Sequence, residues 1–268
     1  MDMHEKRLRY AKGNVIELAL AAALFFLAVL LPGKGGVAAM LSGLFTPLEV
    51  TVGIWAVVYA LLLVFCAYNV IPSVRNNPDR GVFIERISFL FMLACILNIG
   101  WIFASYYGLV LYSAGASILL LVVLTAIYLR LHAGSARAGR AETYLVQVPF
   151  RVYLGWTVMV VIANVSAALA GVKWDGFGLG PQIWALIGIM IAVAAAVVML
   201  VKRGDVWFSL VIAVALLGLF LDRLLGAAAS NQILITMAGM GAVMVAGAIL
   251  YLLASGYRRD SRPFRPGT

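Results

Sequence analysis

Residues 94–104 read ACILNIGWIFA and lie inside an apolar run that extends from residue 86 to residue 106. A run of about twenty such residues can cross the hydrocarbon core of a membrane as one helix. Asn98 and Trp101 lie three residues apart, so they share one face of that helix. Lipid offers no hydrogen bond to the amide, which must therefore find a partner on another helix. The stretch predicts a membrane helix with one polar face directed toward its neighbours.

The composition of the whole chain supports a membrane protein. Of its 268 residues, 64% are hydrophobic and 12% are charged, and the mean hydropathy is +1.04. Soluble domains are roughly half apolar and about a quarter charged. Cys66 and Cys95 both lie in apolar segments and are interpreted as small core residues. The two histidines, His4 and His132, lie in the leading tail and at a helix end, so we expect no histidine-ligated haem or metal site in the bundle.

Eight segments are apolar and long enough to span a membrane, which predicts an all-α, polytopic transmembrane bundle of about eight helices. The segments are residues 14–32, 49–71, 86–106, 108–131, 149–171, 182–201, 205–224 and 232–254. A very tight turn around Tyr106, Tyr107 and Gly108 must join the third segment to the fourth. The first segment could be a signal peptide, but its length and the position of Glu17 in its first turns favour a retained helix.

The distribution of basic residues predicts the orientation. With eight crossings and a cytoplasmic amino terminus, 17 of the 20 Lys and Arg residues fall in cytoplasmic stretches, as the positive-inside rule expects. Only Lys34, Lys173 and Arg223 fall on the other side. Both termini are therefore predicted to be cytoplasmic. The net charge of +9 is mainly a topology signal that also favours contact with anionic lipids, and it does not indicate nucleic-acid binding.

Aromatic and amide residues repeat along one face of three predicted helices. These residues are Trp55 and Tyr59; Asn98 and Trp101; and Tyr153, Trp156 and Asn164. Each group needs a hydrogen-bond partner when it is buried in a bundle, so the three faces are expected to form a shared polar seam. Two interpretations remain open. The seam either serves only to bond the helices together, or it forms an aromatic pocket for a flat hydrophobic ligand.

The carboxylates give little support for catalysis. Glu17, Glu49, Asp205 and Asp222 lie near helix ends, and Asp205 after Gly204 is typical of an N-cap residue. The sequence contains no Ser/His/Asp arrangement, paired carboxylates at depth, Cys-x-x-Cys motif or phosphate-binding glycine loop. We therefore expect neither an enzyme nor a metal site. Glu17 lies deepest, and it would be the proton-coupling group if the chain were a transporter.

Four motifs resemble those of the tryptophan-rich sensory protein family, also called TspO/MBR or translocator protein. The first two are Phe45-Thr46-Pro47 and the Trp55/Tyr59 pair that follows it. The third is Leu97-Asn98-x-x-Trp101, and the fourth combines Pro149-Phe150 with Trp156 and Asn164. They occur in the family's order, over residues 14–172. The sequence departs from the family's pattern at Phe45, which stands where the family has Trp, and at Leu48, which stands where it has a second Pro.

The resemblance implies a site and a domain division. In the family, the loop and the seam below it are linked to the binding of tetrapyrroles and other hydrophobic ligands. The resemblance therefore implies that nine residues bind such a ligand: Phe45, Pro47, Trp55, Tyr59, Asn98, Trp101, Tyr153, Trp156 and Asn164. Residues 1–172 would form the five-helix TspO-like unit. Residues 173–268 would add three helices and a basic tail, as in a longer, bacterial-type branch of the family. The protein would then lie in a bacterial inner membrane. Small residues at Gly188, Ala192 and Ala196 suggest docking of these helices onto the unit, or homodimerisation.

Three functions are therefore carried forward from the sequence. The first is a membrane receptor or sensor that binds a hydrophobic or tetrapyrrole-like molecule. The alternatives are a secondary transporter of a small hydrophobic solute and a non-catalytic structural protein whose seam is packing only.

Overall fold

The computed structural model describes residues 13–23, 25–26, 48–71, 82–132, 140–172, 175–225 and 232–260. Within these ranges the chain is helical and contains no β-strand. Seven helices are long and apolar enough to cross a membrane, and the shorter helix Gly13–Ala23 precedes them. The prediction of an all-α polytopic bundle is confirmed. Residue 24 and residues 27–32 of the predicted first segment lie outside the described residues.

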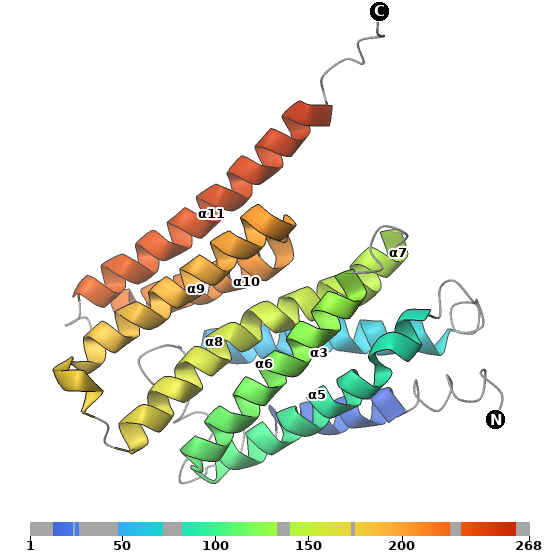
Figure 1. Cartoon of the computed structure of the whole chain (residues 1–268), viewed down its shortest axis with the longest axis horizontal. Helices are drawn as coiled ribbons and strands as arrows, with labels where there is room; N and C mark the ends of the chain where they lie inside the picture. The colour runs from blue at the N-terminus through green and yellow to red at the C-terminus, as the bar shows by residue number, and fades with distance from the viewer. Residues whose placement is uncertain are drawn as a thin grey trace, which may run out of the picture.

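The bundle is built from long helices that run side by side (Figure 1). They are α3 (Leu48–Val70), α5 (Val82–Tyr106), α6 (Val110–His132), α8 (Val148–Gly171), α9 (Pro181–Arg203), α10 (Val206–Leu225) and α11 (Gln232–Asp260). The short elements are α7 (Arg140–Glu142), the π-helical turn η2 (Thr143–Gln147) and the 3-10 turn η3 (Gly176–Gly178). α8 lies centrally and packs against α3, α6, α9 and α10.

The start of the fifth spanning helix differs from the prediction. The apolar run predicts a span over residues 149–171. In the structure, α7, η2 and α8 instead form one continuous helical run from Arg140. The Val148 N–H donates to the carbonyl of Thr143, five residues earlier, which is the hydrogen-bond spacing of a π turn. Pro149 has no backbone N–H and cannot donate the hydrogen bond that an α-helix requires. The wider π turn before it allows the helical run to continue past the proline.

Two glycines end helices where the sequence predicts tight connections. Gly108 has a φ of 69° after α5, and the Leu109 N–H donates to the Ala104 carbonyl at 2.8 Å. Gly204 has a φ of 62° after α9. Both closures use the left-handed conformation that glycine adopts without steric cost. The Asp205 carboxylate then accepts the Phe208 N–H at 3.1 Å, which confirms its role as an N-cap.

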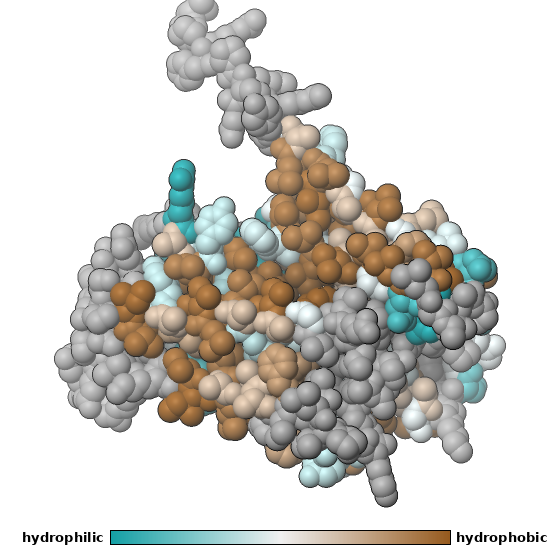
Figure 2. All heavy atoms as spheres, turned by 180° about the vertical axis from the view of Figure 1, so that it is seen from behind, coloured by the Kyte–Doolittle hydropathy of each residue, from teal (hydrophilic) through white to brown (hydrophobic). Residues whose placement is uncertain are grey.

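The outer surface is that of a membrane protein. Large apolar side chains such as Leu119, Val122, Val243 and Met244 are exposed along the spanning helices. Figure 2 shows apolar residues spread over much of the visible face, with hydrophilic residues nearer its edges. Exposed apolar area of this extent is incompatible with water and suits lipid. The chain is an integral membrane protein.

The last three helices contact the rest of the bundle mainly through α10 and α8. A Cβ atom on Gly155 of α8 would lie 2.7 Å from the Phe208 carbonyl oxygen of α10, so only glycine permits this approach. Ala196 of α9 is fully buried, and its carbonyl accepts the Ser209 hydroxyl of α10 at 2.9 Å, so this residue joins α9 to α10. Docking of these helices onto the five-helix unit through Gly188, Ala192 and Ala196 stays a prediction. Homodimerisation stays a prediction.

Replacing Gly155 with Ala is expected to lower the free energy of unfolding by about 1–3 kcal/mol, because the added methyl group meets backbone that cannot rotate away. Gly100→Ala in α5 is the matched control, since a Cβ there meets nothing within 4 Å and alanine favours helix. Unfolding of both variants in mixed detergent micelles measures the difference. Equal stability of the two variants would contradict the close contact.

Candidate functional site

The structure brings the seven residues of the predicted seam together on three neighbouring helices. All seven side chains are buried, and the three indoles are among the largest fully buried side chains of the described chain. We define the aromatic seam by these residues, which are Trp55 and Tyr59 of α3, Asn98 and Trp101 of α5, and Tyr153, Trp156 and Asn164 of α8. The predicted association of three helix faces is therefore present in the structure. Ligand binding by these residues stays a prediction.

Asn98 is the polar centre of the seam. Its Nδ2 donates to the Tyr59 hydroxyl at 3.2 Å and to the Tyr153 hydroxyl at 3.1 Å. One amide thus links α5 to both α3 and α8. The tyrosines present their polar tips to the amide while their rings stay in the apolar interior, as expected for buried tyrosine.

A second polar link joins Trp101 to α8. The Trp101 Nε1–H donates to Asn164 Oδ1 at 3.3 Å, and the Asn164 Nδ2 donates to the Val160 carbonyl at 2.8 Å. The Ser113 hydroxyl of α6 lies 3.4 Å from the same Asn164 oxygen. Ser113 could not be predicted from the sequence, because a single serine in an apolar helix carries no pattern of its own.

The aromatic rings of the seam pack against one another around Trp55. The Trp55 ring is 5.3 Å from the Trp101 ring at 25°, and 6.3 Å from the Trp156 ring in an edge-to-face arrangement. Phe25 adds a wall from the first helical segment, with its ring 5.2 Å from Trp55 and nearly parallel to Trp101. The spacing of Leu18, Ala21 and Phe25 marks that helix face, but it does not identify the partner.

Three buried polar atoms of the seam have no hydrogen-bond partner among the residues that the structure describes. They are Trp55 Nε1, Trp156 Nε1 and Asn98 Oδ1. One atom comes from each of the three helices that form the seam. An unpaired polar atom in an apolar interior typically costs about 1–3 kcal/mol. Two N–H donors and one oxygen acceptor thus lie among the aromatic rings of the seam. A bound molecule with polar groups could form hydrogen bonds with them and remove that energetic cost.

The remaining sequence candidates fall into two groups. Phe45 and Pro47, the predicted loop residues, lie outside the described residues. Glu17 is partly buried in the Gly13–Ala23 helix, and within the described ranges nothing forms a hydrogen bond with its Oε2. Cys66 and Cys95 are free and buried. Within the described ranges, no group of three or more His, Cys, Asp or Glu residues is arranged to hold a metal ion.

A comparison with known proteins identifies the family of the chain. The model of the family described as TSPO-like protein matches residues 12–251, a range that includes the aromatic seam and the three helices after residue 172. No curated protein and no solved structure matches the chain. The match spans nearly the whole sequence and agrees with the motifs that converge in the bundle. The chain belongs to the TSPO-like protein family.

Proposed function

We propose that the chain is a non-enzymatic membrane receptor or sensor that binds a flat hydrophobic molecule, such as a tetrapyrrole, in the aromatic seam. The observation that carries this proposal is the set of three unpaired buried atoms, Trp55 Nε1, Trp156 Nε1 and Asn98 Oδ1. Aromatic walls with a few convergent polar groups are typical of small-molecule sites. The membrane would be a bacterial inner membrane, with both termini in the cytoplasm.

Binding at the seam requires side chains to move. The indoles of Trp55 and Trp101 are fully buried and lie ring against ring, so they occupy the position that a ligand would take. Phe25 covers both rings from the first helical segment. Displacement of the Phe25 wall would expose Trp55 and Trp101 together, which makes this helix the expected gate.

Titration of the purified full chain with protoporphyrin IX tests the proposal. Bound porphyrin is expected to quench the fluorescence of the seam tryptophans. Trp101→Phe and Trp156→Phe are each expected to weaken binding about fivefold, since phenylalanine lacks the indole N–H and has a smaller ring, a loss of about 1 kcal/mol. Trp207→Phe is the matched control, because Trp207 lies on α10, outside the seam, and is 38% exposed. Unchanged affinity in both seam variants would refute this site.

A secondary transporter is the second candidate, and Glu17 is the observation that favours it. Its Oε2 is buried in the bundle, and no residue that the structure describes forms a hydrogen bond with it. Ionisable groups inside membrane bundles often carry protons during transport. Flux of a hydrophobic solute into proteoliposomes that depends on a proton gradient and is lost in Glu17→Gln would favour transport. Binding without flux would favour the receptor.

A purely structural role makes a separate prediction. If the seam is packing only, no hydrophobic ligand should raise the thermal midpoint of the wild-type chain. A receptor must instead be stabilised by its ligand through mass action. Asn98→Leu would lower stability under either function, so ligand-dependent stabilisation is the measurement that separates them.

A further inference from the structure

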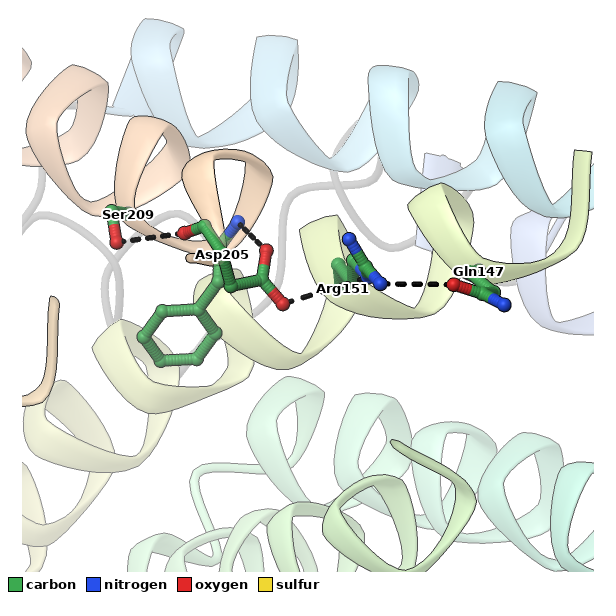
Figure 3. A network of polar contacts seen from close by, with 5 residues as sticks. Gln147, Arg151, Asp205 and Ser209 are labelled. Atoms are coloured by element: carbon green, nitrogen blue, oxygen red, sulfur yellow. Dashed lines mark hydrogen bonds and ion pairs between the residues drawn. The ribbon is translucent and has the colours of Figure 1, made fainter. Parts of the chain in front are cut away.

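A second polar network lies outside the aromatic seam, where η2 and α8 meet the start of α10 (Figure 3). Arg151 Nη2 donates to Gln147 Oε1 at 2.9 Å, and Arg151 Nε lies 3.6 Å from Asp205 Oδ2. The Asp205 side chain is only 1% exposed. Ser209 closes the network by donating to the Asp205 carbonyl at 3.0 Å.

A small, partly open pocket adjoins this network. Its lining residues are Tyr128, Leu131, Gln147, Phe150 and Arg151. Its free volume is about 10 Å³, which is room for one water-sized group. The guanidinium has five N–H donors, so donors beyond those facing Gln147 and Asp205 are left for an acceptor in the pocket. A single oxygen atom of a larger group, with the rest of that group outside, fits this space.

The pocket lies at the depth of lipid headgroups. Arg151 precedes Gly171, the last residue of α8, by twenty residues, which corresponds to about 30 Å of helix. That distance equals the thickness of the hydrocarbon core. Arg130 follows Val110, the first residue of α6, by the same number of residues. The exposed side chains of Leu129 and Tyr144 flank this level, and tyrosine is typical of the membrane interface.

The charge at this end of the bundle favours an anion. The described ranges 128–132, 140–151 and 200–209 contain five Arg or Lys residues and two carboxylates, Glu142 and Asp205. Asp205 offsets only the charge of Arg151. The two carboxylates offset two of these five positive charges, so this end of the bundle keeps a surplus of three positive charges, and Lys202 and Arg203 at the end of α9 contribute to it.

We propose that the pocket between α6 and α8 binds the phosphate of an anionic phospholipid in the adjoining leaflet. One phosphate oxygen enters the pocket and accepts a hydrogen bond from Arg151, while the acyl chains follow the apolar outer face of α6. Basic pockets between membrane helices commonly bind such headgroups. The π turn η2 immediately before α8 carries Gln147 at its end, and turns of this type often occur at functional sites. This site is independent of any ligand in the aromatic seam.

Lipid titration of the purified full chain, followed by native mass spectrometry, tests the proposal. The wild-type chain is expected to bind phosphatidylglycerol more tightly than phosphatidylcholine. The double variant Arg151→Gln/Asp205→Asn keeps the net charge and avoids an unpaired carboxylate, and it is expected to weaken phosphatidylglycerol binding about tenfold or more. Gln147→Leu leaves the ion pair in place and should also weaken binding. It keeps the test decisive if the double variant fails to fold.

The controls separate this site from general attraction between charges. Arg223→Gln removes a cation at the opposite end of α10, and it should leave this binding unchanged. If Arg223→Gln weakens phosphatidylglycerol binding as much as the double variant does, the proposal is overturned. It is also overturned if neither the double variant nor Gln147→Leu weakens that binding. Competition by inorganic phosphate as effective as by phosphatidylglycerol would assign the pocket to a free anion and would also overturn the lipid assignment.

Discussion

Replacing Arg151 with Gln is expected to lower the free energy of unfolding by about 3 kcal/mol. The substitution leaves the Asp205 carboxylate buried without its counter-charge, and breaking one half of a buried pair commonly costs 3–5 kcal/mol. The lower end of that range applies because the Arg151 side chain is 20% exposed and keeps some contact with headgroups or water. Reversible unfolding in mixed detergent micelles measures the change.

The double variant Arg151→Gln/Asp205→Asn is the matched control for this loss. Asparagine can still accept the Phe208 N–H as an N-cap, and the uncharged pair leaves no buried ion behind. We therefore expect the double variant to recover most of the stability that Arg151→Gln loses. A double variant no more stable than the single one would show that the ion pair is not the cause. Arg151→Gln should also loosen the contact of α10 with α8 more than any contact inside the aromatic seam.

Replacing Trp55 with Ala is expected to lower the free energy of unfolding by about 3–5 kcal/mol, the range for a large aromatic residue removed from a packed core. The Trp55 ring contacts those of Phe25, Tyr59, Trp101, Tyr153 and Trp156. In a membrane, the transfer of apolar surface out of water contributes little, since lipid is also apolar. The loss of these ring contacts and the resulting cavity still apply.

Chemical rescue distinguishes a cavity from general damage in this variant. Dry apolar cavities of this kind bind small aromatic molecules. Added indole should therefore raise the thermal midpoint of Trp55→Ala, and it should leave that of the wild-type chain unchanged. Trp207→Ala is the control, because its partly exposed ring on α10 leaves no enclosed space. A Trp55→Ala chain that loses less than about 1 kcal/mol would contradict the central position of Trp55 in the seam.

The aromatic seam illustrates how much of a candidate site can be predicted from the spacing of residues within single helices. Asn98 and Trp101 lie three residues apart, so any helix places them on one face, and the same holds for Trp55 and Tyr59. An amide in lipid requires a partner, and large polar aromatics on two other helices could supply one. The hydrogen bonds from Asn98 to Tyr59 and Tyr153 fulfil that expectation. The unpaired Nε1 atoms of Trp55 and Trp156 could not be predicted, because pairing depends on angstrom-scale positions.

Phe25, Gly155 and the Arg151–Asp205 pair show the limit of the same reasoning. Lipid and protein interior are both apolar, so a membrane helix lacks the polar outer face that tells a soluble helix which side is buried. The positive-inside rule counts Arg151 as a cytoplasmic charge in either of two orientations. The side chain can face lipid headgroups or the carboxylate of Asp205, just before α10, and the rule does not distinguish them. Gly155 gives no signal of its own until Phe208 is placed against it.

The sequence by itself determined that the chain is a membrane bundle, where its spanning helices lie, and which residues share each polar face. These properties follow from the length of apolar runs and the 3.6-residue period, which act within a single helix. Only the tertiary structure decided that Phe25 covers the seam, that α8 lies between α3 and α10, and that Arg151 faces Asp205. Those contacts depend on how helices far apart in the chain rotate and pack, and close side-chain fit between helices determines that arrangement.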